Sequence, residues 1–432
     1  MHIHLVGIAG SMTAPLALAL QKQGHQISGS DQEKTYPPFN KQLKKANIPI
    51  NQTEINSQID LAIIGSSYAS FHNTQTDFED IKIQKIPYIS ATQYISQNLI
   101  KNNSILIAGS YGKTTITAAV TYLLKNANYD PAYMIGGQSL NRLDSLHFSN
   151  SNWSVVEADE SINGLDTKAK FLYYPVKYLI LTSAKWEHRE SYSNENENFN
   201  AFKQLVENIP KDGLLIYNSN DTLILPLLSF AKCQKIPYSE TKISNQLLGK
   251  HNQENLGAVE TLANKLKISS ESIKRSFKNF KGIKRRLEVV GNNKGIIFID
   301  DFAQSADRIG AALKAIKDTH PQSRLKVFYE NHASFMQYRS NLNLLLPSFE
   351  LATETVIYKL KFNSKIKQSD RLIAKDFLNI IPRSIYLPIP EEIVKHYQNS
   401  LKTGDILVHF SSGGSDGLKI FQKIINLYKN NK

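Results

Sequence analysis

The alternation of short apolar runs with segments of helical length most constrains the fold of this 432-residue chain. Nine runs, rich in β-branched residues and bounded by turn formers, are typical of strands. They read HIHLVGI, LAIIGSS, SILIAGS, WSVVEAD, YLILTSA, GLLIYNS, GIIFIDDF, LKVFYEN and DILVHFSS. Residues 114–126 and 305–319 are examples of the helix-length segments between them. Because parallel strands require a covering crossover, the alternation predicts parallel sheets of the α/β class.

Three Rossmann-like units can be separated along the chain. The first covers residues 1–103 and ends where a polar KNN precedes a new strand. The second covers residues 104–286, and the third covers residues 287–432. A chain of this length has room for two to four domains, so we expect three.

Composition limits the cellular setting. Hydrophobic residues make up 41% of the chain and charged residues 21%, which is enough apolar material for ordinary packed cores. Cys233 is the single cysteine, so an intramolecular disulfide is excluded and a reducing compartment is favoured. No run of about 18 apolar residues predicts a membrane span. The opening MHIHLVGIAG resembles a first strand more than a signal peptide. We therefore expect a cytoplasmic monomer.

The formal net charge of +13 raises the question of a polyanionic partner. The lysines are scattered, and no segment combines aromatic residues with arginines in a nucleic-acid-binding module. A compositional bias toward Lys and Asn explains the charge, and we expect no nucleic-acid partner. A cationic surface also suits a small polyanionic substrate, although charge alone does not show one.

The stretch ILIAGSYGKTTIT, residues 105–117, predicts a phosphate-binding loop between a strand and a helix. Two glycines permit a tight turn, and the N-terminus of the following helix attracts anions. Lys113 would reach the β- and γ-phosphates of a nucleotide, and the Thr114 hydroxyl would bind Mg²⁺. The standard motif has a further glycine where this chain has Ile107, so an ordinary strand–turn–helix connection is the alternative.

The shorter pattern G-x-x-G-K-T-T resembles the loop of the Mur ligases, the ATP-dependent amide-forming ligases of peptidoglycan synthesis. Their loop usually reads T-G-T-x-G-K-T-T, with Ala108 and Ser110 replacing two threonines here. The resemblance implies three Rossmann-like domains, the central one a P-loop-type ATPase domain. It also implies an ATP site on the loop formed by Gly109, Ser110, Tyr111, Gly112, Lys113, Thr114 and Thr115.

Two further segments match the metal site of that family. VVEADES resembles its E-A-D-E segment, which implies that Glu157 binds Mg²⁺, although such acids also occur at helix N-termini. LTSAKWEHRESY places His188 at the histidine near the second metal, although a lone histidine is often only a surface or packing residue. Lys185 replaces a family glutamate three residues before it. Lys203 has the spacing of a carbamylated lysine found in some relatives, but an ordinary solvated lysine is expected.

Other segments match the nucleotide contacts of the family. LLGKHNQENLGAV resembles G-x-H-N-x-x-N, which implies that Asn252 and Asn255 approach the adenine; a polar helix start is the alternative. FKGIKRRLEVVG places Arg286 at a phosphate-contacting arginine. FIDDFAQSADRI places Asp301 near the ATP ribose or the hinge.

Some positions depart from the family pattern near the active centre. Relatives usually continue D-D-F-A with a histidine and a proline, where this chain has Gln304 and Ala306. Tyr111 stands where close relatives often carry histidine. The segment FYENHASFMQYRSNL departs from E-P-R-S-N, and it contains the predicted acceptor-binding residues His332 and Arg339.

The first unit carries the predicted site for a UDP-linked substrate. GIAGSM has G-x-x-G in place of the full dinucleotide motif, so an NAD-dependent oxidoreductase is a weak alternative. The resemblance implies a pyrophosphate site at Gly7, Gly10 and Ser11, with Asp31 at the end of the second strand. IPYISATQYI, YMIGGQSL and SSGGSDGLKIFQKII resemble the murein peptide ligase branch of the family.

The resemblance implies a reaction in which ATP and Mg²⁺ activate the carboxylate of UDP-N-acetylmuramate as an acyl phosphate. The amine of L-alanyl-γ-D-glutamyl-meso-diaminopimelate, recovered from wall turnover, would then attack it. Two alternatives stay open at this point. One is ligation of L-alanine in de novo synthesis, and the other is a degenerate paralogue that binds nucleotides without ligating.

Overall fold

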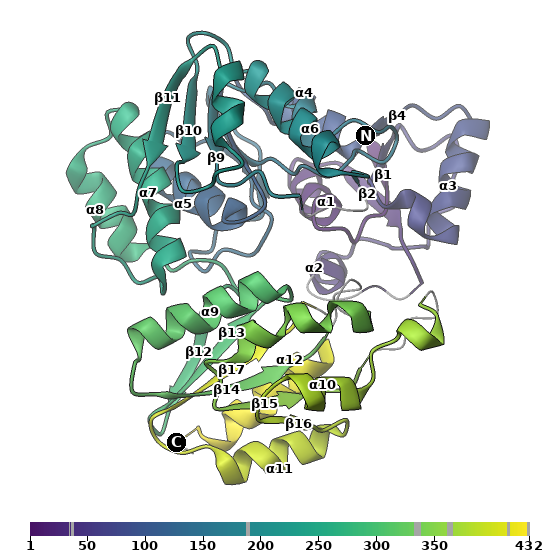
Figure 1. The fold of residues 1–432 in the computed structure, drawn as a ribbon. Coiled ribbons are helices and arrows are strands. Elements are labelled where there is room, and N and C mark those ends of the chain that lie inside the picture. Colours follow the sequence, from purple (N-terminus) through teal and green to yellow (C-terminus); the bar gives the residue numbers. More distant parts are fainter. Residues whose placement is uncertain are drawn as a thin grey trace. The chain divides into compact units, whose positions relative to one another are not determined.

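The computed structural model describes residues 1–33, 35, 39–186, 191–331, 338–360, 366–412 and 415–429 (Figure 1). The chain forms two compact units. One consists of Met1–Gln246 with Asn252–Gly282, and the other of Leu247–His251 with Ile283–Lys432. The described residues of the first unit contain two sheets, and those of the second contain one.

The first sheet is parallel throughout, with the order β2-β1-β3-β4. Its strands are β1 (His2–Val6), β2 (Gln26–Ser30), β3 (Leu61–Ile64) and β4 (Tyr88–Ser90), and its helices are α1 (Thr13–Lys22), α2 (Phe39–Lys45), α3 (His72–Ile83) and α4 (Ala91–Asn98). Leu5 and Ile63 belong to one apolar cluster, whereas Val6 and Ile64 belong to another. Successive side chains therefore enter opposite layers, which explains why β3 (LAII) is apolar at every position and why β1 ends in two neighbouring apolar residues.

The second sheet has the order β11-β10-β9-β5-β8-β6-β7 and is parallel except for the β6–β7 pair. Its strands are β5 (Asn103–Ala108), β6 (Ala132–Met134), β7 (Leu146–His147), β8 (Trp153–Glu157), β9 (Tyr178–Leu181), β10 (Leu214–Asn218) and β11 (Gln234–Tyr238), and the helices are α5 (Lys113–Asn126), α6 (Glu195–Glu207), α7 (Lys250–Lys265) and α8 (Ser270–Asn279). β5 is central, between β9 and β8. Ligands of parallel sheets bind beyond the carboxyl ends of such strands.

The third sheet has the order β12-β13-β17-β14-β15-β16 and is parallel except for the β12–β13 pair. Its strands are β12 (Glu288–Asn293), β13 (Ile296–Asp301), β14 (Arg324–Tyr329), β15 (Glu354–Ile357), β16 (Ser384–Tyr386) and β17 (Asp405–Phe410), and the helices are α9 (Ala306–Thr319), α10 (Ala374–Ile380), α11 (Pro390–Ser400) and α12 (Ser415–Leu427). Two separate apolar clusters, one containing Ile299 and the other Phe298, use opposite faces of β13.

Short 3₁₀ helices complete the described secondary structure. They are η1 (Tyr68–Ser70), η2 (Lys170–Tyr173), η3 (Leu225–Phe230), η5 (Arg339–Leu344), η6 (Leu346–Phe349) and η7 (Gln368–Asp370). Within the described ranges, we find no helix with the length and apolarity that a bilayer crossing demands.

The predicted α/β class is confirmed, and all nine predicted runs contain strands. The two helices expected at 114–126 and 305–319 are α5 and α9, each within one residue of the expected start. The antiparallel strands β7 and β12 depart from the all-parallel expectation. The boundaries at 103/104 and 286/287 stay a prediction.

Gly257 on α7 offers a test of how closely this helix packs against the chain at Ser239. A Cβ at this position would lie 1.7 Å from the Ser239 carbonyl oxygen, whereas one at Gly310 on α9 would have 3.5 Å to its nearest neighbour. We expect Gly257→Ala to lower the free energy of unfolding by about 1–3 kcal/mol through overpacking. Gly310→Ala is the control and should raise it by up to about 1 kcal/mol. Urea unfolding measures both, and equal stability of the two variants would contradict the close contact.

Candidate active site

The predicted phosphate loop connects the central strand β5 to helix α5. Gly109 has φ +121° and Gly112 has φ +78°, and both values lie in the region that favours glycine. A Cβ at Gly109 would lie 2.4 Å from Thr182 Oγ1, and one at Gly112 would lie 2.4 Å from Asn255 Oδ1. Both positions therefore require glycine for their backbone conformation and for space.

Hydrogen bonds from β9 and the segment after it fasten this loop. The Thr182 hydroxyl donates to the Tyr111 carbonyl oxygen at 2.5 Å, and the Ser110 hydroxyl donates to the Lys185 carbonyl oxygen at 2.7 Å. The Lys185 ammonium lies 5.9 Å from the centre of the Tyr111 ring, within the range of a cation–π contact. Two positions that depart from the family pattern, Tyr111 and Lys185, are thus neighbours.

Lys113 begins α5 and lies among carboxylates. Its Nζ is 2.6 Å from Oε2 of Glu160, whose side chain is only 2% exposed. Burial alone would lower the pKa of Lys113, but the carboxylates of Glu160, Asp159 and Glu157 outweigh burial and raise it. The Lys113 ammonium therefore carries its positive charge at neutral pH, and it forms an ion pair with Glu160.

Thr114 and Glu157, two of the predicted Mg²⁺ ligands, lie side by side. The Thr114 hydroxyl donates to Glu157 Oε1 at 3.1 Å, and the Gly136 amide donates to Glu157 Oε2 at 2.8 Å. A Cβ at Gly136 would lie 2.5 Å from the same oxygen, so only glycine leaves room for this carboxylate. Glu157 ends β8, and no helix begins at residues 158–160, so the alternative of a helix N-terminus is wrong.

The donor types fit a magnesium ion. A hydroxyl and a carboxylate supply hard oxygen atoms, which Mg²⁺ prefers, together with phosphate oxygens and water. The third predicted ligand, His188, falls in residues 187–190, outside the described ranges. The described residues contain no cluster of three or more His, Cys, Asp or Glu side chains arranged to hold a metal ion. The pair Thr114–Glu157 is therefore the part of the predicted metal site that the structure brings together.

A second ion pair lies beside the first. Lys170 Nζ is 2.9 Å from Asp159 Oδ2 and 2.8 Å from the Ser161 hydroxyl, which itself donates to Asp159 at 2.6 Å. Burial would raise the pKa of Asp159, but the charges of Lys170 and Lys113 lower it well below the ordinary value. Lys170 thus neutralises an acid that would otherwise compete for Lys113.

The predicted adenine contacts Asn252 and Asn255 lie in the first turns of α7. Both are buried, and Asn255 Nδ2 donates to Asn252 Oδ1 at 3.1 Å. Asn255 lies directly against Gly112, so α7 and the loop share one site. Asn252 and Asn255 lie at the start of a helix, which the alternative interpretation also predicts. A polar helix start alone would not require both side chains to be buried beside the loop.

In the first sheet, the predicted pyrophosphate turn follows β1. Gly7 has φ +76°, and the Thr13 hydroxyl donates to its carbonyl oxygen at 2.5 Å. Asp31 directly follows β2, and its carboxylate accepts a hydrogen bond from the Ala9 amide at 2.7 Å. Gly10 and Ser11 lie in the same turn, before α1. Asp31 thereby shapes the turn, and the predicted binding of a UDP group there stays a prediction.

In the second unit, Arg286 lies in a constrained turn before β12. The flanking residues Arg285 and Leu287 have φ +58° and +49°, which costs a non-glycine residue on the order of 1 kcal/mol each. Asp301 accepts the Leu287 amide and the Ala303 amide, both at 2.7 Å. Burial raises the pKa of Asp301 although Arg286 acts to lower it. Gln304 is buried and donates to the Ala303 carbonyl oxygen at 2.9 Å.

Some predicted residues lie elsewhere or outside the described ranges. His332 falls in residues 332–337, which the structure does not describe, and Arg339 on η5 donates to Asp376 at 3.1 Å. Lys203 on α6 lies 4.4 Å above the Phe230 ring and 4.0 Å from Glu207. These contacts agree with the expectation of an ordinary lysine.

Sequence reasoning missed the residues that surround the predicted ones. Glu160 forms an ion pair with Lys113, Lys170 forms one with the partly exposed Asp159, and Gly136 leaves space for Glu157. The third acid of E-A-D-E, which is its second glutamate, is a visible signal for Glu160. Nothing in the local sequence distinguishes Lys170 or Gly136 from other lysines and glycines.

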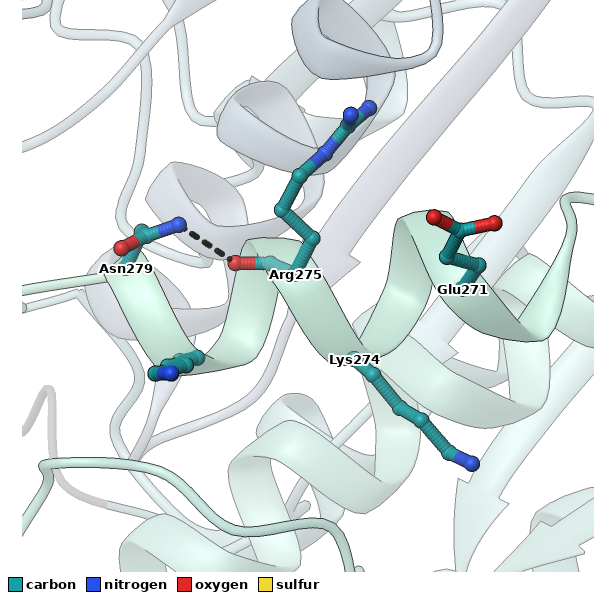
Figure 2. A pocket seen from close by; sticks show the side chains of 5 residues that line it. Glu271, Lys274, Arg275 and Asn279 are labelled. Atoms are coloured by element: carbon teal, nitrogen blue, oxygen red, sulfur yellow. Dashed lines mark hydrogen bonds between the residues drawn. The ribbon is translucent and has the colours of Figure 1, made fainter.

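A separate pocket of about 510 Å³ lies on helix α8. Figure 2 shows its side chains, Glu271, Lys274, Arg275, Lys278 and Asn279, which all come from that one helix. Asn279 Nδ2 donates to the Arg275 carbonyl oxygen at 3.0 Å. None of these residues belongs to the predicted site.

Two sequence models of one family match the chain. The catalytic domain of the Mur ligase family matches residues 2–102, and the Mur ligase middle domain matches residues 107–245, together more than half of the chain. The chain belongs to the Mur ligase family. Members of this family are ATP-dependent amide-bond ligases, so the chain is an ATP-dependent ligase that forms C–N bonds.

Individual relatives come from two branches. The UDP-N-acetylmuramate–L-alanyl-γ-D-glutamyl-meso-2,6-diaminoheptandioate ligase of Escherichia coli K12 is 28% identical over 73% of this chain and 76% of its own length. The UDP-N-acetylmuramate–L-alanine ligase of Desulfitobacterium hafniense is 24% identical over 98% and 99%.

Solved structures show the same fold. The murein peptide ligase of Psychrobacter arcticus has a TM-score of 0.69 at 23% identity and covers 99% of this chain and 98% of its own. The UDP-N-acetylmuramate–alanine ligase of Thermotoga maritima has a TM-score of 0.78 at 21% identity and covers 99% of both. These likenesses support the three-domain α/β architecture.

The Lys170–Asp159 pair predicts a measurable pH dependence of stability. Lys170→Met should lower the free energy of unfolding by about 1–2 kcal/mol at pH 7, because it leaves the partly buried Asp159 carboxylate, whose side chain is 33% exposed, without its partner. The lowered pKa of Asp159 contributes stability above the unfolded value of about 3.9, and this contribution is lost as the pH falls through the folded value. The difference from the wild type should therefore shrink below about pH 4.

Urea unfolding at several pH values measures this difference, with Lys203→Met as the control. Lys203 is a partly exposed lysine with a weak pair, so its replacement should change stability by less than about 0.5 kcal/mol. A pH-independent effect of Lys170→Met would contradict the ion-pair explanation.

Proposed function

We propose that this enzyme joins UDP-N-acetylmuramate to L-alanyl-γ-D-glutamyl-meso-diaminopimelate, with ATP and Mg²⁺, in peptidoglycan recycling. The observation that carries the proposal is the pair formed by Thr114 and Glu157, 3.1 Å apart, beside the charged Lys113 at the start of α5. This arrangement places oxygen ligands and a fixed cation where a helix N-terminus and a glycine turn already favour phosphate.

In the proposed ATP site, the residues Gly109 to Thr115 hold the phosphates through backbone amides. The Lys113 ammonium leaves the Glu160 carboxylate and binds oxygens of the β- and γ-phosphates. The negative charge that builds up during phosphoryl transfer therefore develops next to this ammonium. Thr114 and Glu157 hold Mg²⁺, which neutralises phosphate charge when it is bound. Asn252 and Asn255 approach the adenine, Arg286 contacts a phosphate, and Asp301 lies near the ribose.

The chemistry that these residues support is activation of a carboxylate. The muramoyl carboxylate attacks the γ-phosphorus, the bond to the bridging oxygen breaks, and ADP leaves. The acceptor amine then attacks the acyl carbon, loses a proton and releases inorganic phosphate. Positioning of the three reactants is the main contribution of the protein, because each step is a displacement that needs alignment.

The remaining predicted sites complete the proposal. Gly7, Gly10, Ser11 and Asp31 form the turn that we assign to the pyrophosphate of the UDP substrate. Arg339, with His332 outside the described ranges, is assigned to the acceptor. A monomeric state and a cytoplasmic location stay predictions.

The identity of the acceptor is the part of the proposal for which a second candidate exists. The relative from Escherichia coli, which is named for the diaminopimelate-containing peptide, supports the tripeptide. The relative from Desulfitobacterium hafniense, which is named for L-alanine and aligns over 98% of this chain, supports L-alanine as the second candidate.

An acceptor assay separates these functions. The protein is incubated with UDP-N-acetylmuramate, ATP and Mg²⁺, with tripeptide or L-alanine in parallel, and phosphate release and product mass are measured. We expect turnover with the tripeptide and little with L-alanine. Turnover only with L-alanine would assign the enzyme to de novo synthesis, and no turnover with either at saturating ATP would favour a degenerate paralogue.

Lys113→Ala tests the phosphate loop. It should reduce the turnover number by at least about 100-fold, because it removes a cation from the site of charge development. Lys125→Ala, at the other end of the same helix, is the control and should leave turnover unchanged, since the contacts of Lys125 are with the exposed Asp130 and the Tyr133 ring and not with the loop. Thermal unfolding of both variants checks folding. A folded Lys113→Ala variant with full activity would remove the loop from the mechanism.

A further inference from the structure

The turn that carries Arg286 is held in a disfavoured backbone conformation. Arg285 and Leu287, on either side of it, both have positive φ, at +58° and +49°. Side chains other than glycine rarely adopt this conformation unless the surroundings fix it. The contacts that fix the turn therefore decide where the Arg286 guanidinium points.

Backbone and side-chain contacts converge on this turn from β13 and β17. The Phe302 amide donates to the Arg285 carbonyl oxygen at 2.8 Å. The Arg285 side chain donates through Nε to Asp300 Oδ2 at 3.0 Å and through Nη2 to the Ser411 carbonyl oxygen. Phe302 lies under both arginines, 5.3 Å from Arg285 and 5.5 Å from Arg286. Asp300 thus accepts from the Arg285 guanidinium, while the Glu288 carboxylate accepts the Arg285 backbone amide at 2.8 Å.

His409 holds the Asp300 carboxylate from the other side. It is paired with Asp300 in the parallel register of β13 and β17, and its Nδ1 lies 2.8 Å from Asp300 Oδ1. A carboxylate only accepts hydrogen bonds when ionised, so Nδ1 is the donor. The ring is fully buried and stacked between Phe328 and Phe421, with ring centres 4.9 and 5.0 Å away, which fixes the plane of the imidazole.

The other ring nitrogen of His409, Nε2, makes no hydrogen bond among the described residues, so the contact of Nδ1 with Asp300 is the hydrogen bond that this ring contributes. Nε2 is buried without a hydrogen-bond partner. A Cβ at Gly417 would lie 3.0 Å from Nε2, so the helix α12 closes against it. A buried histidine that leaves one nitrogen unsatisfied carries a cost, which the hydrogen bond to Asp300 must offset. An apolar side chain would fill the same space without that cost.

We propose that His409 is a positioning residue for ATP binding. It fixes the Asp300 carboxylate, Asp300 fixes Arg285, and Arg285 fixes the strained turn that presents Arg286. The inference rests on the proposed contact of Arg286 with a phosphate of ATP. His409 touches no substrate in this scheme, and its effect passes through two residues of the same compact unit.

The test is ATP binding by the full chain, measured by calorimetric titration with ATP in the presence of Mg²⁺. His409→Met keeps the apolar packing but removes the donor, and we expect the dissociation constant for ATP to rise about tenfold. His409→Asn should restore most of the affinity, because its amide nitrogen can take the place of Nδ1. Asp300→Asn, which weakens the contact to Arg285, should weaken ATP binding to a similar extent if His409→Met does not fold.

A matched control is available in the same compact unit. His396 Nε2 makes a comparable contact of 3.0 Å with Glu354, which lies on β15 and also pairs with Lys326 at 3.0 Å. His396→Met should lower thermal stability without changing the dissociation constant for ATP. An equal loss of ATP affinity in His396→Met and His409→Met would overturn the proposal, since it would show a general loss of stability.

A double-mutant cycle separates this inference from the function on which it rests. If Arg286→Ala binds ATP as the wild type does, the proposed phosphate contact is wrong. If Arg286→Ala weakens binding, His409→Met should add little to it, because both changes remove the same contact. Fully additive effects, or unchanged binding by a folded His409→Met variant, would overturn the role of His409 while leaving that of Arg286 intact.

Discussion

The parallel pairing of β5 with β8 is the constraint on which the candidate active site depends. Ile107 of β5 lies opposite Glu157 of β8 in the register, so the carboxylate emerges at the sheet edge where the phosphate loop begins. α5 starts directly after that loop and brings Thr114 to Glu157. A shift of one residue in this register would turn Glu157 to the other face of the sheet. The apolar strands that fix the register therefore also fix the site.

Charge balance explains the arrangement around this edge. Three carboxylates, those of Glu157, Asp159 and Glu160, meet two ammonium groups, those of Lys113 and Lys170. Lys170 pairs with Asp159 and Lys113 pairs with Glu160, whereas the Glu157 carboxylate accepts a hydrogen bond from the Thr114 hydroxyl. The short sequence E-A-D-E thus gives its three acids different partners, and a divalent cation with phosphate would complete the balance at Glu157.

Much of the fold followed from local pattern, whereas the details of the site did not. The nine apolar runs were recognisable because strands buried on both faces are apolar at every position. The short strands β4, β6, β7 and β16 were not, because two or three residues carry no periodic signal. The strands β2, β11, β12 and β15 were also not among the predicted runs, because they mix polar with apolar residues. The spacing of Gly109 and Gly112 before Lys113 was enough to predict the phosphate loop from the sequence. The partners Lys170, Gly136 and His409 act through contacts between residues distant in sequence, and no local pattern specifies such contacts.

The ion pair between Lys113 and Glu160 gives the loop an anion of its own. Any ligand that binds Lys113 must displace a nearly buried carboxylate that is permanently attached to the chain. Glu160 therefore acts as an intramolecular competitor, and a singly charged anion gains nothing by replacing it. A polyphosphate with its cation brings more charge and more hydrogen-bond acceptors than one carboxylate does. Common small anions are thereby poor competitors for Lys113, and selectivity for a nucleotide begins before any contact with the base.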